Sequence, residues 1–316
     1  MAASIVTVGN FDGVHQGHRR LLGRARSLAD AHGAEVCVLT FDPPPSAILS
    51  PGAEPPQLES IDRRIERLGD AGADRVRVIR PDAEWLGRSA EDFVREVSQT
   101  HGVVGWVEGP GFRFGHRRRG DLTLLRSMGK ALGFEVAVVE PARVALPDGT
   151  LRPASSSLAR WLVGRGRVAD AACVLGRPFE MTGNVIQGEQ RGRTIDVPTA
   201  NLDPEAWRGS ITPRDGVYAG VGCLLEDPEA PSFPAAISVG VKPTFAGKAL
   251  TIEAHLLGYA PGDPDALYGR RLRLGFHRFL RDAWRFPDLG ALRAQIARDL
   301  ADTRMLDAVS CASPVS

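Results

Sequence analysis

The sequence predicts two domains: an α/β domain with a parallel, Rossmann-like sheet, followed by a small antiparallel β-barrel with a terminal helix. Three observations predict this architecture. The chain has 316 residues, enough for about two domains of roughly 100–200 residues each. Its first 150 residues alternate short apolar runs with segments of helical periodicity. From Pro178 onward, short β-rich runs are separated by Gly, Pro and Asp turns, which is typical of small barrels and sandwiches.

Strands and helices alternate in the first domain, as they do in right-handed βαβ units. Strands are expected at Ile5–Val8, Glu35–Thr40, Arg75–Ile79, Val103–Val107 and Glu135–Val139. Helices are expected at Gly17–His32, Ile61–Ala71, Ala90–Ser98 and Asp121–Leu132. The proline-rich stretch from Pro43 to Pro56 is predicted to be a loop. Because such sheets bind ligands at the carboxyl ends of their strands, the loops after Val8, Thr40 and Val107 become candidates for a site.

Two short helices, Ser155–Gly164 and Val168–Leu175, are expected to bridge the domains, which we place at residues 1–175 and 176–316. The strands of the barrel are expected at Asn184–Gln187, Gly216–Leu225, Ala235–Val239, Thr251–Leu257 and Arg271–Phe276. A terminal helix is expected over about Asp288–Asp302. Its apolar residues have near-helical spacing and should pack on the barrel; they are Leu289, Leu292, Ile296 and Leu300.

Composition argues against several classes of protein. Thirty-nine Lys and Arg residues against 38 Asp and Glu give a net charge of +1, so no nucleic-acid partner is expected. A glycine-rich loop ending in Gly-Lys-Ser/Thr is absent, which excludes a P-loop. The four cysteines are at least 50 residues apart and form no zinc-ligand pattern. With no apolar run of ~18 residues and no basic signal-peptide region at the N-terminus, we expect no membrane association and a cytoplasmic location.

The strongest motif of the first domain is GNFDGVHQGH, residues 9–18, directly after the first strand. Glycines allow close backbone approach, and the start of the following helix presents free N–H groups to an anion. His15 and His18 are three residues apart, so both can face the same phosphates and stabilise charge that develops there. Two neighbouring histidines can also be ordinary surface residues, but the strand–loop–helix context favours a catalytic role for both. Phosphate or nucleotide contacts are expected from Gly9, Phe11, Asp12, Gly13 and Gly17.

This segment resembles the HxGH signature of the nucleotidyltransferase superfamily. More specifically, it is similar to that of the prokaryotic bifunctional riboflavin kinase/FMN adenylyltransferases, the FAD synthetases, and the resemblance extends over essentially the whole chain. The run GPGFRFG, residues 109–115, matches the second loop of that family and implies flavin contacts by Phe112 and Phe114. The run SSSLAR matches a segment that holds ATP phosphates, which implies this role for Ser155, Ser156, Ser157 and Arg160.

A second resemblance lies in the C-terminal domain, where GRTIDVPTANL, residues 192–202, is similar to the Pro-Thr-Ala-Asn segment of riboflavin kinases. The resemblance implies that Thr199 and Asn201 bind Mg²⁺ together with ATP and that Glu253 is the general base for the riboflavin 5′-hydroxyl. It further implies nucleotide contacts by Gly192 and Arg193, a flavin contact by Arg281, and a phosphate-covering flap over residues 176–192. His255 shares the strand face of Glu253 and is interpreted as a structural histidine.

Four positions depart from the family pattern. Pro44 stands where the family has a histidine, Gly111 where it has Asp or Asn, Trp284 where it has an acidic residue, and Asp196 where Gly is common. Each lost polar contact is worth roughly 1–3 kcal/mol if it is buried and not replaced. These departures are either tolerated drift or signs of altered substrate preference.

The resemblance implies an enzyme that phosphorylates riboflavin to FMN with ATP and Mg²⁺, then adenylylates FMN to FAD with release of pyrophosphate. Two alternatives remain. One is a diverged paralogue that has only the kinase activity or that carries out nucleotidyl transfer with an altered flavin or nucleotide substrate. The other is a non-catalytic flavin-binding regulator, which would not need a general base. The sequence does not indicate an oligomeric state.

Overall fold

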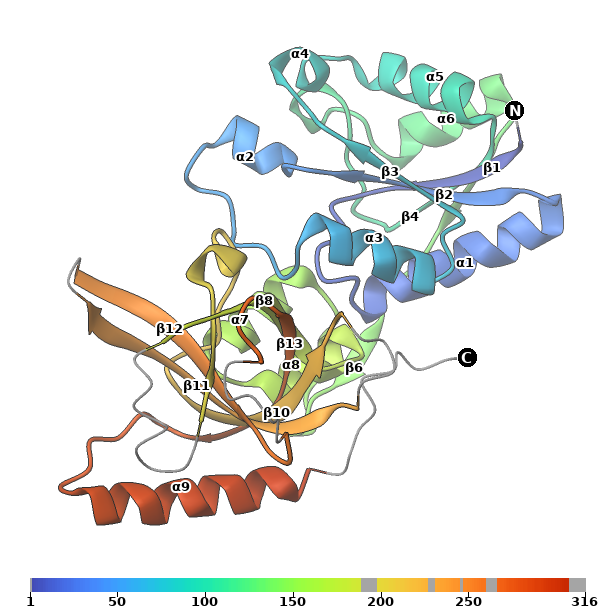
Figure 1. Ribbon diagram of the computed structural model, residues 1–316. Coiled ribbons are helices and arrows are strands. Elements are labelled where there is room, and N and C mark those ends of the chain that lie inside the picture. Colours follow the sequence, from blue (N-terminus) through green and yellow to red (C-terminus); the bar gives the residue numbers. More distant parts are fainter. Residues whose placement is uncertain (1, 189–197, 227–230, 245–246, 260–265, 307–316) are drawn as a thin grey trace. The chain divides into compact units, whose positions relative to one another are not determined.

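The computed structural model describes residues 2–188, 198–226, 231–244, 247–259 and 266–306 (Figure 1). Contacts divide the chain into two compact units, Met1–Ser156 and Ser157–Ser316. The domain boundary that the sequence suggests at residue 175 stays a prediction. Among the described residues, no helix is long and apolar enough to span a membrane.

Parallel strands form the main sheet of the first unit, in the order β3-β2-β1-β4-β5. Ser4 of β1 pairs with Glu35 of β2, and on its other side Ile5 pairs with Gly105 of β4. The strand order reverses between β1 and β4, which is where open α/β sheets form their ligand-binding crevice. The strands are β1 (Ser4–Val8), β2 (Glu35–Phe41), β3 (Arg75–Ile79), β4 (Val103–Glu108) and β5 (Glu135–Val138).

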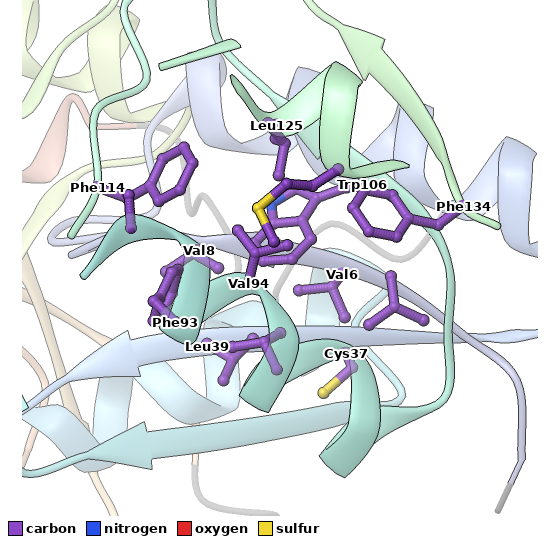
Figure 2. Close-up of a cluster of buried hydrophobic side chains, with 14 of the residues drawn as sticks. Val6, Val8, Cys37, Leu39, Phe93, Val94, Trp106, Phe114, Leu125 and Phe134 are labelled. Atoms are coloured by element: carbon purple, nitrogen blue, oxygen red, sulfur yellow. The ribbon is translucent and has the colours of Figure 1, made fainter. Parts of the chain in front are cut away.

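Helices cover both faces of this sheet, so its central strands β1, β2 and β4 are buried on both sides. On one face α1 and α3 cover Ile5 and Val38. On the other, α5 and α6 pack against Val6 and Trp106 (Figure 2). The helical elements are α1 (Gln16–His32), α2 (Pro45–Leu49), α3 (Ile61–Asp70), α4 (Ala83–Leu86), α5 (Ala90–His101), η1 (His116–Arg118) and α6 (Leu122–Leu132).

In the second unit, antiparallel strands close into a barrel in the order β10-β11-β12-β9-β8-β13. Its interior is filled by fully buried side chains, among them Tyr218, Ile237 and Phe276. The strands of the barrel are β8 (Phe179–Ile186), β9 (Ala200–Leu202), β10 (Gly216–Leu224), β11 (Phe233–Thr244), β12 (Gly247–Leu256) and β13 (Arg271–Arg281). The helical elements are α7 (Ser156–Gly164), α8 (Val168–Leu175), η3 (Pro204–Trp207) and α9 (Leu289–Arg304).

The expected parallel sheet, antiparallel barrel and terminal helix are confirmed, but several local expectations are wrong. The stretch between residues 43 and 56 is not a loop throughout, because Pro45 begins α2 in the first turn, where its missing N–H is tolerated. Strand β8 begins at Phe179 instead of Asn184, and β13 continues past Phe276. The hairpin of β6 (Arg143–Ala145) and β7 (Leu151–Pro153) is unexpected, since three-residue strands carry no periodicity.

The face that α9 buries matches the expected apolar stripe only in part. Leu292, Ile296 and Leu300 are half-buried, but Leu289 is 65% exposed, and the most buried residues are Asp299 and Thr303. Both carboxylate oxygens of Asp299 accept hydrogen bonds from Arg281 of β13, at 2.7–3.1 Å. A bidentate ion pair, in addition to apolar packing, therefore anchors the terminal helix to the barrel.

Candidate functional site

The loop between β1 and α1 has an unusual backbone. Phe11, Gly13 and Val14 all have positive φ, at 48°, 82° and 33°. A β-branched residue such as Val14 rarely adopts this conformation, and such strain persists where the surroundings over-determine it. Val14 is fully buried, and its N–H donates to the Phe11 carbonyl at 3.0 Å. Local strain of this kind is concentrated at functional sites.

The two histidines of this loop stand together at the start of α1. His15 is the N-cap: its Nδ1 accepts hydrogen bonds from the N–H groups of Gly17 and His18, at 3.1 and 3.4 Å. These bonds assign the proton of the neutral ring to Nε2. The ring of His18 stacks on that of His15 with 3.6 Å between centroids. The pair of imidazoles therefore lies at a helix N-terminus, as the sequence predicts.

His18 is held in its neutral form. Burial, and secondarily the proximity of His15 and Arg64, lower the pKa of His18 well below its usual range. Its Nδ1 is buried and has no hydrogen-bond partner within the part of the chain that the structure describes. A neutral imidazole can still donate a hydrogen bond from one nitrogen to a phosphate oxygen.

Buried charges hold the loop in place from behind. Asp12 accepts hydrogen bonds from the Leu58 N–H at 3.0 Å and lies 3.7 Å from the guanidinium of Arg64. Glu59 accepts from the Gly13 N–H at 2.9 Å and pairs with Arg67 at 2.9 Å. Asp12, Glu59 and both arginines are buried. Sequence reasoning missed Glu59, Arg64 and Arg67, because nothing in their spacing shows that α3 packs behind this loop.

Removing one member of this network should destabilise the first unit. Arg67→Met leaves Glu59 buried without its partner, and breaking a buried pair costs about 3–5 kcal/mol. In the intact protein burial already raises the pKa of Glu59 to about 7. The folded variant therefore binds a proton more readily than the unfolded chain, so its stability falls as pH rises above about 4.5. Urea unfolding should show a deficit at pH 8 that shrinks towards pH 5.

The control for Arg67→Met is Arg95→Met. Arg95 pairs with Asp92 on the surface at 3.2 Å, and both side chains are more than half exposed. Such exposed pairs contribute about 0.2–1 kcal/mol. Equal and pH-independent losses in the two variants would contradict a stabilising role for the buried network.

A cavity of about 820 Å³ lies at the carboxyl ends of the central strands. Gly9 and Asn10 line it from the β1–α1 loop, and Phe112 and Phe114 line it from the loop after β4. The rings of Phe112 and Phe114 stack with 5.1 Å between centroids. Besides aliphatic residues such as Ile48 and Leu86, its wall contains aromatic and basic side chains: Phe41, Trp85, Arg88, Phe93, Arg113, His116, Arg117 and Arg118. The cavity can therefore accept a flat ring system that carries negative charge.

The serine run at the start of α7 reaches the same loop through Ser156. Its hydroxyl donates to the Asp12 carbonyl at 2.7 Å. Ser155 also belongs to the first unit, whereas Ser157 and Arg160 belong to the second. Within the first unit, the structure thus brings together two segments that are 144 residues apart and that both carry predicted phosphate contacts.

Strand β12 presents Glu253 on the outer face of the barrel. Ile252 and Ala254 point into the core, and Glu253, between them, is half-buried on the other face. Glu253 pairs in register with Asn201 of β9. Residues directly opposite in an antiparallel pair share a face with Cβ atoms about 4.5–5.5 Å apart. The structure therefore places the predicted base beside a predicted metal ligand.

Gly188 approaches the side chain of Asn201 closely. A Cβ atom at residue 188 would lie 2.4 Å from the amide nitrogen of Asn201, so any larger residue there would displace the Asn201 side chain. Thr199 lies half-buried two residues before Asn201. Three predictions fall wholly outside the described residues: the nucleotide contacts Gly192 and Arg193, and the departure Asp196. Of the predicted flap over residues 176–192, Phe179–Ile186 form strand β8 of the barrel, and residues 189–192 lie outside the described part of the chain.

Arg281, the predicted flavin contact of the second unit, is engaged in another interaction. Besides its ion pair with Asp299, its guanidinium lies over the rings of Trp284 and Phe286, at 5.1 and 5.6 Å. Trp284 is 53% exposed. The departure at residue 284 thus puts an aromatic face on the surface next to a fixed arginine.

Comparisons with known proteins agree with two distinct domains. A family model described as FAD synthetase matches residues 1–146, and one described as riboflavin kinase matches residues 175–306. A bifunctional riboflavin kinase/FMN adenylyltransferase of Pseudomonas fluorescens is 37% identical over 311 residues, which cover 97% of this chain and 94% of that protein. One of Escherichia coli strain K12 is 34% identical over 297 residues, with coverage of 93% and 90%.

A solved structure resembles the whole chain. It is described as a macrolide-efflux protein from Streptococcus pneumoniae, and it superposes with a TM-score of 0.85 at 25% sequence identity. The superposition covers 97% of this chain and 96% of that one. The two chains therefore share both folds.

Proposed function

The chain belongs to the family of bifunctional riboflavin kinase/FMN adenylyltransferases, and from this premise we propose how its residues carry out the two reactions. The enzyme phosphorylates riboflavin to FMN and adenylylates FMN to FAD, with ATP as the donor in both steps. The observation that carries this assignment is that each unit has its own set of reactive groups. His15 and His18 stack at a helix start in the first unit, and Glu253 stands opposite Asn201 in the second.

In the kinase step, Glu253 is the general base. Its carboxylate accepts the proton of the riboflavin 5′-hydroxyl while that oxygen attacks the γ-phosphorus of ATP and ADP leaves. Thr199 and Asn201 offer neutral oxygen ligands, and Asn201 stands opposite the proposed base Glu253. Hard cations prefer such oxygens, so these residues fit Mg²⁺, which would neutralise phosphate charge when bound.

In the adenylylation step, a phosphate oxygen of FMN attacks the α-phosphorus of ATP, and pyrophosphate leaves. Both nucleophile and donor are already ionised, so the step needs charge stabilisation more than a base. Neutral His18 and the Nε2–H of His15 supply hydrogen bonds to the crowded phosphate oxygens. The positive end of the α1 dipole and the hydroxyl of Ser155 add to this stabilisation, while the hydroxyl of Ser156 holds the loop through the Asp12 carbonyl.

The 820 Å³ cavity of the first unit is the proposed flavin site. Its volume is in the range of small-molecule pockets, and Phe112, Phe114 and Trp85 offer apolar faces to the isoalloxazine ring. Arginines of the same wall attract the dianionic FMN. ATP and flavins are the partners, no nucleic acid or membrane takes part, and we place the enzyme in the cytoplasm, where ATP is available.

The assignment is tested by incubating the purified protein with riboflavin, ATP and Mg²⁺ and separating the flavins by chromatography. FMN and FAD should both form. FMN alone would indicate a diverged kinase, and tight flavin binding without turnover would indicate a regulator. A second reaction with FMN in place of riboflavin measures adenylylation by itself.

We expect adenylylation to be the slower step, and Gly111→Asp to accelerate it. Gly111 lines the flavin cavity, and a Cβ atom there meets nothing within 4 Å, so an aspartate fits. One regained hydrogen bond of about 1–2 kcal/mol corresponds to roughly 5- to 30-fold in transfer efficiency. Steady-state rates of FAD formation from FMN measure the gain.

Gly111→Ala is the matched control, because it fills the same space without a polar group and should leave the rate unchanged. Pro44→His is the companion to Gly111→Asp, but Pro44 is buried, so an imidazole must displace neighbours there. If Gly111→Asp behaves like Gly111→Ala and the wild type forms FAD as fast as FMN, the departure at residue 111 is drift.

A further inference from the structure

His255 lies on the same outer face of β12 as Glu253, two residues further along the strand. The residues that alternate with them, Ala254 and Leu256, are buried in the barrel. His255 is therefore not a core residue, and neither the kinase step nor the packing of the barrel accounts for its ring.

The ring of His255 is fixed by one hydrogen bond to the backbone. Its Nδ1 lies 2.8 Å from the carbonyl oxygen of Pro198. A carbonyl only accepts, so Nδ1 must carry a proton and donate it. In the neutral ring this assigns the lone pair to Nε2.

The Pro198 carbonyl belongs to the segment that carries the proposed cation ligands. Strand β9 begins only at Ala200, which pairs with Ala254, so Thr199 and Pro198 precede the first paired residue of this strand. Continuing the register by one residue puts His255 opposite Thr199. The imidazole of His255 therefore hydrogen-bonds the peptide group between Pro198 and Thr199, just beyond the last backbone pair of β9 and β12.

We propose that His255 is a positioning residue of the kinase site, which orients Thr199 towards the cation and phosphates of bound nucleotide through the Pro198 carbonyl. The inference rests on the proposed kinase function. Groups that orient a ligand from behind commonly affect metal affinity by 10–100-fold, although they do not touch the metal. His255 takes no part in proton transfer from riboflavin, so it should affect nucleotide binding and leave the turnover rate nearly unchanged.

The test compares three variants of the full-length chain. His255→Ala removes the donor, His255→Leu removes it but keeps apolar bulk, and His255→Asn keeps an N–H near the position of Nδ1. Titration calorimetry with ADP and Mg²⁺ measures binding without turnover. We expect the dissociation constant to rise roughly 10–100-fold in the Ala and Leu variants and to stay within about threefold of wild type in the Asn variant. The half-saturating MgATP concentration in kinase assays should follow, with kcat and the KM for riboflavin little changed.

Thr251→Ala is the matched control. Thr251 flanks Glu253 on the other side, shares its face, and its hydroxyl donates to the Gly240 carbonyl of β11 at 3.1 Å. That bond leads away from Thr199, so its loss should leave nucleotide binding unchanged. Thermal unfolding of each variant checks the fold; if the Ala variant does not fold, the Asn and Leu variants still decide.

Two results would overturn the inference. One is wild-type affinity for MgADP in the Ala or Leu variant. The other is a folded Asn variant that binds as poorly as the Leu variant. A wild-type chain that neither phosphorylates riboflavin nor binds MgADP would instead contradict the proposed function itself, so the two failures are distinguishable.

Discussion

Replacing Glu253 by alanine is expected to lower riboflavin phosphorylation by about 100-fold or more. General bases contribute typically 10²–10⁴-fold, because without them the hydroxyl proton has no acceptor as the oxygen attacks phosphorus. Glu253→Gln should lower the rate by a similar factor, since the amide has the shape of the carboxylate but is neutral and cannot accept the proton. The measurement is the initial rate of FMN formation from riboflavin at saturating ATP and Mg²⁺.

The same variants should keep FMN adenylylation, because His15 and His18 belong to the other unit. Glu205→Ala is a suitable control, since Glu205 pairs with Arg208 at 2.5 Å on the surface and both side chains are more than half exposed. If phosphorylation survives in Glu253→Ala, another group is the base. If both activities fall together in a folded protein, the two sites are not independent.

The sequence predicts the larger elements well for a physical reason. The central strands β1, β2 and β4 are buried on both faces, and helices such as α1 and α5 bury one face each, so their apolar patterns are distinct. Short elements such as α2 and β9 cover less than two periods, and their patterns are indistinguishable from those of loops. In α9 the apolar spacing misses the buried Asp299, because its ion pair with Arg281, which spacing does not reveal, lies on the packed face.

Some site residues can be predicted from the sequence and others cannot. The residues of the loop between β1 and α1 follow one another in the chain, so a motif can identify His15 and His18. The pairing of Glu253 with Asn201 depends on the closure of the barrel, and the bond from His255 to Pro198 depends on where β9 ends. The sequence pattern alone therefore nominates these residues without showing that they meet.

Replacing His18 by alanine is expected to lower FMN adenylylation by about 100- to 1,000-fold and to spare riboflavin phosphorylation. Removing one pre-positioned donor to a developing anionic centre typically costs this much. His18 is suited to this role because burial keeps its imidazole neutral. A neutral ring at the start of α1 is not repelled by the positive end of the helix dipole. The measurement is FAD formation from FMN and ATP, with pyrophosphate release as a second readout.

The control for His18→Ala is His32→Ala at the other end of α1. His32 pairs with Glu135 on the surface at 2.6 Å, at the end of α1 opposite to His15 and His18. Removing its imidazole should therefore leave both activities unchanged. The mutation at residue 18 also removes the stacking partner of His15, so the structure of the loop must be checked by its effect on stability. A folded His18→Ala variant with near-normal FAD formation would exclude His18 from the reaction and leave His15, whose Nδ1 already accepts the amides of α1, as the remaining imidazole donor.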